Sequence, residues 1–196
     1  MKNQTNKKLV QISFFGMIIV VMSLTPLGFI QVGPIKATLV HIPVIFASLL
    51  LGSKFGGMMG FIFGFMSLIQ NTMAPGLLSF AFSPMIPVIG TSSGSWLALI
   101  IVFIPRIIVG LIPGYLYHKT KSLSVSVLSG SLLNTILVLS LIGILFTNAY
   151  ASAMNVNASS LIKIIVGIVF TNGMIEALIA LMIIPPLYKR LVKLGQ

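Results

Sequence analysis

Four polar side chains lie deep within apolar stretches of this sequence: Arg106, Asn134, Asn172 and Glu176. Glu176 is the only acidic residue among 196, and it follows Asn172 by about one helical turn. Polar and charged side chains are costly inside a membrane span, and they usually face a bundle interior or a cavity. One cation, one carboxylate and two amides can bind a small polar molecule by ion pairing and hydrogen bonding. These four residues are therefore the first candidates for a binding site.

The rest of the chain has the composition of an integral membrane protein. Hydrophobic residues make up 57% of it and charged residues 7%, with a mean hydropathy of +1.14. Soluble domains contain about a quarter charged residues. A chain with so few polar groups cannot cover its own surface against water. We therefore expect a lipid bilayer to surround it.

Six apolar stretches are candidates for membrane spans, each of which needs about 20 residues as helix, with a range of about 17 to 25. We expect helices at about 9–30, 35–51, 55–70, 96–117, 124–148 and 161–187. The predicted fold is an all-α integral membrane protein with six transmembrane helices in one substrate-binding domain over residues 1–196. At 1.5 Å per residue, the four polar groups come from three helices at depths that differ by about one turn, roughly 15 Å or more below one membrane face.

The distribution of basic residues predicts how the chain crosses the membrane. The net charge of +11 could indicate nucleic-acid binding, but most of the basic residues flank the apolar stretches. Lys and Arg near span ends are retained on the cytoplasmic side. One side of the predicted bundle collects Lys2, Lys7, Lys8, Lys54, Lys119, Lys121, Lys189, Arg190 and Lys193, and the other has Lys36 and Lys163. Both termini are therefore expected in the cytoplasm.

The longest predicted connection, about 71–95, joins the third and fourth helices on the external side and carries no charge. Loops of this length are uncommon in compact proteins and are usually functional or disordered. Its aromatic residues argue against disorder. We expect Ser79, Phe80 and Phe82 to belong to a lid over an external cavity, and the alternative is a segment that rests on lipid headgroups.

Glycines at helical spacing predict close packing between helices. Gly56, Gly60 and Gly64 fall four residues apart, as do Gly110 and Gly114. Membrane helices associate where small side chains let their backbones approach. We expect these contacts to lie within one chain rather than between two copies.

Several kinds of chemistry have no signature here. The sequence lacks a phosphate-binding GxxxxGK[ST] loop, an HExxH zinc motif, paired carboxylates and cysteine. We expect no enzymatic activity, no metal and no cofactor in this chain. Two alternatives to a binding site remain: a buried Arg106–Glu176 pair without a ligand, or a self-sufficient carrier or channel that uses this pair as a gate or proton relay. His41, near the external end of the second span, is either a ligand or a packing residue.

Six phrases resemble the substrate-binding S components of energy-coupling factor (ECF) vitamin transporters, and the likeness covers essentially the whole chain. They are ATLVHIPV (37–44), LLGSKFG (50–56), NTMAP (71–75), SFAFSP (79–84), PRIIVG (105–110) and NGMIE (172–176). The HIP, NT and SFAFSP portions are most similar to pantothenate-type members. The resemblance implies a high-affinity vitamin-binding subunit of an ABC importer.

The implied substrate-binding residues are Arg106, Asn134, Asn172, Glu176, Asn71, Thr72 and His41. Pantothenate carries a carboxylate, an amide and hydroxyls, which one cation and several amides would suit. Glu176 is awkward beside a carboxylate unless Arg106 neutralises it or hydroxyls donate to it. Hydroxymethylpyrimidine or another neutral or cationic vitamin is therefore the alternative substrate.

The resemblance also implies partners in the plasma membrane of a prokaryote. S components of this type dock onto a membrane T component that is coupled to two cytoplasmic ATPases, so ATP and Mg would be used by the partners. Family members present a small-xxx-small pattern for docking on the first helix. Here the corresponding positions are Ser13 and Met17, with Gly16 between them. The methionine departs from that pattern.

Overall fold

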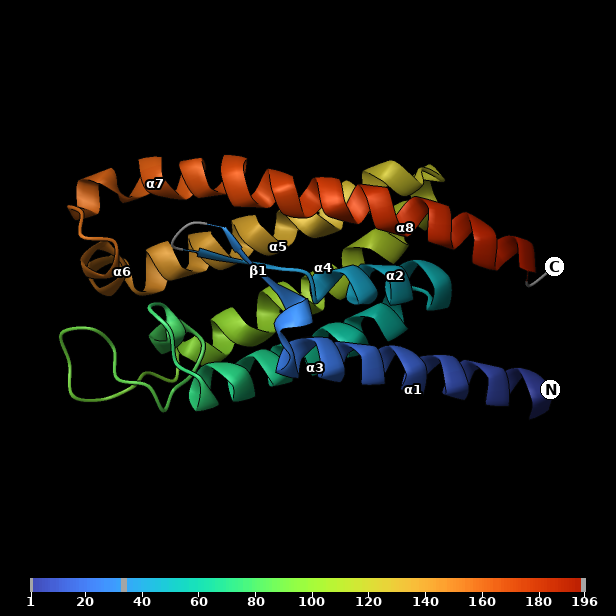
Figure 1. Cartoon of the computed structure of the whole chain (residues 1–196), viewed down its shortest axis with the longest axis horizontal. Helices are drawn as coiled ribbons and strands as arrows, with labels where there is room; N and C mark the ends of the chain where they lie inside the picture. Colours follow the sequence, from blue (N-terminus) through green and yellow to red (C-terminus); the bar gives the residue numbers. More distant parts are fainter. Residues whose placement is uncertain (1, 33–34, 195–196) are drawn as a thin grey trace.

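The computed structural model describes residues 2–32 and 35–194 and shows a bundle of helices that run along one long axis (Figure 1). The helices are α1 (Lys2–Leu24), α2 (His41–Leu51), α3 (Ser53–Met73), α4 (Ala98–Thr120), α5 (Leu123–Leu145), α6 (Thr147–Ala153), α7 (Leu161–Ile168) and α8 (Met174–Leu194). Three 3-10 turns are η1 (Pro26–Gly28), η2 (Ser79–Ala81) and η3 (Ala158–Ser160). A π-helical turn, η4 (Val169–Gly173), joins α7 to α8.

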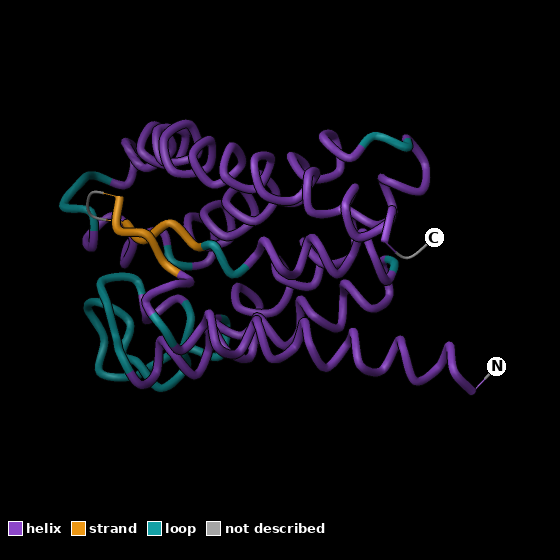
Figure 2. Tube along the Cα trace, turned by 45° about the vertical axis from the view of Figure 1, so that its right-hand side comes forward, coloured by secondary structure: helices purple, strands orange, loops and turns teal. Residues whose placement is uncertain are grey.

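The first turn of α1 and the last turn of α8 lie at the same end of the bundle in both views (Figures 1 and 2). Three helical segments of the described chain are long and apolar enough to cross a membrane, namely Ala98–Thr120, Leu123–Leu145 and Ala158–Lys193. Lys8–Leu24 and His41–Leu51 are shorter apolar helices. The described residues thus form the helical, strongly apolar structure that the composition predicts.

The main departure from the predicted helices lies between α1 and α2. The predicted helices 9–30 and 35–51 were wrong where the first ends and the second begins. Instead, β1 (Phe29–Val32) and β2 (Ile35–Thr38) pair there as antiparallel strands. Pro26 and Gly28 end the helical region, since proline lacks an amide hydrogen and glycine is a poor helix former. Strands are rich in the β-branched residue types that this segment contains. Hydropathy alone does not distinguish the two structures.

Other boundaries move by a few residues. The expected helix 55–70 extends to Met73, so Asn71 and Thr72 lie in the last turn of α3 and not in the loop. The expected helix 96–117 is α4 at 98–120, and 124–148 ends at Leu145 before the separate helix α6. The expected helix 161–187 is confirmed as one helical run but continues to Leu194 through Pro185 and Pro186.

Glycine brings the backbones of α3 and α4 into contact. A Cβ atom on Gly60 would lie 2.1 Å from the carbonyl oxygen of Arg106, and one on Gly56 would lie 2.1 Å from that of Gly110. No other residue type fits at these distances without a backbone shift. The prediction that these glycines pack within one chain is therefore confirmed. This contact also fixes the position of the α4 turn that carries Arg106.

Two apolar clusters fill the bundle, one toward each end. The first includes Ile19, Val44, Ile45, Met59, Val109, Val127 and Ala180. The second includes Phe80, Ile101, Leu139, Ile142, Phe146, Tyr150 and Leu161. Along α4, α5 and the α7–α8 run, the four polar residues named above lie between the members of these two clusters. The polar layer is therefore enclosed by apolar packing on both sides.

Candidate functional site

A cavity of about 80 Å³ lies in this polar layer, between the hairpin, α4, α5 and the η4–α8 junction. It is lined by Thr38, Arg106, Asn134, Thr135, Val138, Leu139, Ile168, Asn172 and Glu176. The structure thus brings together the four polar side chains that the apolar stretches contain. All four are at least 94% buried, with exposed fractions of 5% or 6%. The tertiary structure adds two threonines to this set.

Both oxygens of the Glu176 carboxylate accept hydrogen bonds from the protein. The backbone N–H of Thr38 donates to Oε1 at 2.7 Å, and the Thr135 hydroxyl donates to Oε2 at 2.9 Å. Within residues 2–32 and 35–194, Glu176 takes part in no salt bridge. A direct Arg106–Glu176 ion pair is therefore not the arrangement in this structure.

Arg106 is held by α4 itself and by two aromatic rings. Its Nη1 donates to the carbonyl oxygen of Ile101 at 2.8 Å. The guanidinium carbon lies 5.4 Å from the ring centroid of Phe63 and 5.0 Å from that of Phe82. Cations at such distances from a ring are attracted by its quadrupole, more strongly when water is excluded. The guanidinium is therefore oriented without a carboxylate partner.

Three buried polar atoms in the cavity lining have no hydrogen-bond partner in the described part of the chain. They are Nε of Arg106, Oδ1 of Asn134 and Nδ2 of Asn172. Buried polar atoms are nearly always satisfied in native structures, and leaving one unpaired costs about 1–3 kcal/mol. Two donors and one acceptor on the wall of one cavity are a natural complement to a polar ligand that carries acceptors and a donor.

The cavity is small for a ligand site, since such pockets typically measure about 300–1,000 Å³. A vitamin-sized molecule can enter only if lining segments move apart. The π-helical turn η4 is one candidate, because such turns are irregular and often occur at functional sites. It carries the buried Asn172 and Gly173, and Glu176 lies in the first turn of α8, three residues after it.

Polar contacts tie the loop after α3 to the end of that helix. The Ser79 hydroxyl donates to Asn71 Oδ1 at 2.7 Å, and the Thr72 and Ser83 hydroxyls are 2.7 Å apart. Neither Asn71 nor Thr72 lines the cavity. Their contacts hold the loop segment that carries Phe80 and Phe82.

The two aromatic residues of this segment pack inward. Phe80 is 2% exposed and meets the Phe146 ring edge-on, with 5.7 Å between ring centroids. Phe82 lies over Arg106. The loop therefore contacts both the residue that follows α5 and the guanidinium, which is inconsistent with a segment that only rests on lipid headgroups.

His41 is fully buried but lies outside the cavity lining. Its Nδ1 hydrogen-bonds the carbonyl oxygen of Thr38, and its Nε2 lies 3.0 Å from the Ser131 hydroxyl. The peptide groups of Thr38 are thus held by His41 on one side and by Glu176 on the other. His41 fixes the end of the hairpin from which Thr38 reaches Glu176.

The expected docking residues do not share one face of α1. Ser13 and Met17 are exposed, and Met17 keeps 59% of its surface. Gly16 turns toward α3, where a Cβ would lie 3.8 Å from Cδ1 of Ile62. The exposed face of α1 that includes Ser13 and Met17 also carries Val10 and Phe14.

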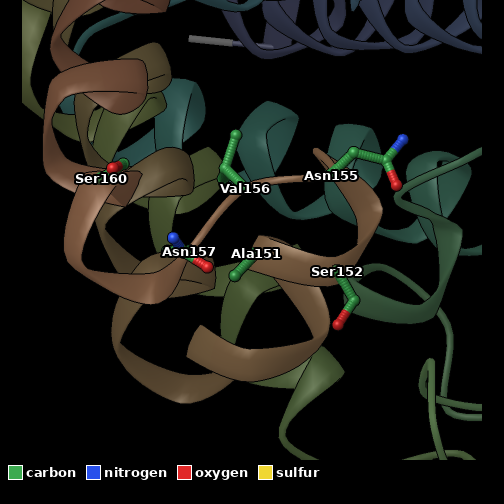
Figure 3. A pocket seen from close by; sticks show the side chains of 6 residues that line it. All are labelled: Ala151, Ser152, Asn155, Val156, Asn157 and Ser160. Carbon is green, nitrogen blue, oxygen red and sulfur yellow. The ribbon is translucent and has the colours of Figure 1, made fainter.

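A second hollow, of about 640 Å³, lies at the surface where α6 passes into η3 (Figure 3). It is lined by Ala151, Ser152, Asn155, Val156, Asn157 and Ser160. None of the sequence-selected site residues is among them, and none of the lining residues is charged. The cavity around Arg106 is therefore the better candidate for a charged ligand.

Thr38, Thr135 and Phe63 were not predicted as site residues. Thr135 directly follows Asn134 and shares its helix, so adjacency was the signal that could have found it. Thr38 contributes its backbone N–H, which no side-chain pattern reveals. Phe63 lies in a glycine-rich apolar helix, where a phenylalanine is expected for core packing alone, so nothing in the sequence marks it as a site residue.

Comparison with known proteins identifies the family. The family model described as "ECF transporter, substrate-specific component" matches residues 7–188. The chain is 36% identical to the pantothenic acid transporter PanT of Lactococcus lactis subsp. cremoris over 154 residues, which cover 74% of this chain and 79% of that protein. It is 29% identical to the pantothenate transporter PanT of Leuconostoc mesenteroides subsp. mesenteroides, with 100% of this chain and 97% of that protein covered. The chain therefore belongs to the substrate-specific components of ECF transporters, multi-pass proteins of the prokaryotic plasma membrane, as its sequence phrases indicate.

Proposed function

We propose that this chain is the pantothenate-binding S component of an ECF-type ABC importer. It binds the vitamin with high affinity and delivers it by docking onto a T component and two ATPases, which hydrolyse ATP with Mg. The observation that carries the proposal is the cluster of unpaired polar atoms on Arg106, Asn134 and Asn172 in one buried cavity. The two relatives named as pantothenate transporters support the choice of vitamin.

The chemistry of the cavity suits this substrate. Arg106 binds the pantothenate carboxylate through its free N–H, while Asn134 and Asn172 bind the amide and hydroxyl groups. A second carboxylate beside that of pantothenate would repel it. The Glu176 carboxylate, however, already accepts two hydrogen bonds, one from Thr38 and one from Thr135. We therefore assign Glu176 the role of holding the cavity wall together, with hydroxyl groups of the substrate as its only candidate contacts.

The residues around the cavity support it rather than bind substrate directly. His41 holds the hairpin, and Asn71 and Thr72 hold the loop. The loop segment with Ser79, Phe80 and Phe82 acts as a lid at the outer end, where Phe82 covers Arg106. Opening of this segment widens the cavity enough to admit the vitamin.

In the membrane, the chain forms one domain with six spans and both termini in the cytoplasm. Support for this orientation is that Lys8, Lys119, Lys121 and the basic end of α8 gather where the first turn of α1 lies (Figure 1), while Lys163 lies in α7 at the opposite end. Cytoplasmic retention of basic residues then places the lid outside. The exposed face of α1 that carries Ser13 and Met17 is the proposed contact with the T component. This chain itself uses no cofactor.

Titration calorimetry of the purified, detergent-solubilised chain against a vitamin panel tests the proposal. We expect one pantothenate site per chain with nanomolar affinity, about −12 kcal/mol. In proteoliposomes, the chain alone should move no pantothenate, and ATP-driven uptake should appear only with the T component and both ATPases present. Tight binding of hydroxymethylpyrimidine and not of pantothenate would identify a different substrate. Uptake by the chain alone would identify a self-sufficient carrier.

Arg106→Gln should weaken pantothenate binding by at least about 30-fold, because removal of one partner of a buried charge-assisted pair costs about 2–5 kcal/mol. Pantothenol has an alcohol in place of the carboxylate. The same substitution should weaken the binding of pantothenol by less than about threefold. Arg190→Gln, at the exposed end of α8, is the matched control and should change neither affinity. Equal losses for both ligands would mean that Arg106 maintains the fold rather than binding the carboxylate.

Phe82→Ala should raise the dissociation rate of pantothenate by about 2- to 30-fold, since a cation–aromatic contact contributes about 0.5–2 kcal/mol. Stopped-flow displacement measures this rate. Phe65→Ala removes an exposed ring from α3 and should leave the rate unchanged. An unchanged rate in Phe82→Ala would count against the lid.

Single cysteines test the orientation, because the natural sequence contains none. In intact cells, a membrane-impermeant maleimide should label Ser92→Cys in the loop and Asn157→Cys after α6. Thr120→Cys, at the end of α4, should react only after the membrane is permeabilised. The reverse pattern would place both termini outside.

A further inference from the structure

A basic pocket lies at the end of the bundle opposite the proposed lid. Its volume is about 530 Å³, and it is formed by the end of α4, the start of α5 and the last turns of α8. The polar residues that line it are Tyr117, Lys121, Ser124, Tyr188, Lys189 and Lys193. It is distinct from the vitamin cavity, which shares none of these residues.

The chain contains no acidic side chain that can neutralise the three lysines. Glu176 is its only acidic residue, and it is buried in the vitamin cavity with both oxygens bound to Thr38 and Thr135. Three ammonium groups on the wall of one pocket repel one another unless an anion lies between them. No acidic side chain in residues 2–32 and 35–194 neutralises them, so the pocket is suited to an anion from outside these residues.

The setting of the pocket is that of a membrane surface. The rings of Tyr117 and Tyr188 meet edge-on with 5.4 Å between centroids, and they pack α4 against α8 at the pocket wall. Tyrosine is enriched at headgroup level in membrane proteins. Exposed apolar side chains, Val125, Leu187 and Leu191, lie on the same helix ends and suit acyl chains. Basic pockets between membrane helices are known to bind anionic headgroups.

We propose that this pocket binds the headgroup of an anionic phospholipid, with the phosphate held by Lys121, Lys189 and Lys193. The Ser124 hydroxyl and the tyrosine hydroxyls supply further hydrogen-bond donors. A lipid bound here bridges α4, α5 and α8, the three helices that carry Arg106, Asn134 and Glu176. The proposal does not depend on which vitamin the chain binds.

Native mass spectrometry of the full chain, delipidated in detergent and titrated with phosphatidylglycerol or phosphatidylcholine, tests the site. We expect one phosphatidylglycerol to bind with clear preference over phosphatidylcholine. The triple variant Lys121→Gln, Lys189→Gln, Lys193→Gln should bind it about 100-fold more weakly, as each lysine near a membrane surface contributes about a fivefold factor. The control Lys8→Gln, Lys54→Gln, Lys119→Gln removes the same charge outside the pocket and should retain the lipid.

Three results would overturn the proposal. Equal losses in the two triple variants would indicate diffuse surface charge rather than a site. Full displacement of the lipid by millimolar inorganic phosphate would indicate a site for a free anion. A wild-type chain with no preference for phosphatidylglycerol would exclude an anionic-lipid site. Circular dichroism shows whether each variant is folded. If the triple variant does not fold, the single variant Lys189→Gln tests the site instead, with an expected loss of about fivefold in affinity for phosphatidylglycerol.

Discussion

The buried carboxylate of Glu176 is the interaction on which the polar centre of this bundle depends. It accepts one hydrogen bond from the hairpin, through Thr38, and one from α5, through Thr135, while it belongs to α8. Hydrogen bonds to a charged group contribute about 1.5–3 kcal/mol each. In an apolar interior there is no water to replace them, so three elements distant in sequence are held in one arrangement.

The separation of Glu176 from Arg106 follows from the same geometry. Because both carboxylate oxygens are bound elsewhere, Arg106 is left to the Ile101 carbonyl and to the rings of Phe63 and Phe82. An aromatic face attracts a cation without neutralising it. The guanidinium therefore keeps its charge and a free N–H for an anionic group, in a cavity that lies between two apolar clusters.

The position of this cation depends in turn on glycine. The α3–α4 contact brings the Gly60 Cα position against the Arg106 carbonyl, so the polar turn of α4 is supported by backbone rather than by flexible side chains. A rigid support of this kind keeps unpaired polar groups from collapsing onto one another. The parts that we propose to adapt are the π-helical turn η4 and the loop segment with Phe82. If they move, the cavity of about 80 Å³ widens while the glycine contact keeps Arg106 in place.

Composition and residue spacing determined the class of protein, the apolar helices, the glycine contact and the four polar residues of the candidate site, because each of these reflects what placing a residue type in lipid costs or allows. The family also followed from short phrases, including those that carry Arg106 and Glu176. The sequence could not show the paired strands at 29–32 and 35–38, since an apolar strand and an apolar helix have the same hydropathy. Nor could it decide how the two buried charges are paired. Only the tertiary structure decided that, because the partners of Glu176 are a backbone N–H and a hydroxyl that lie 138 and 41 residues away in the chain.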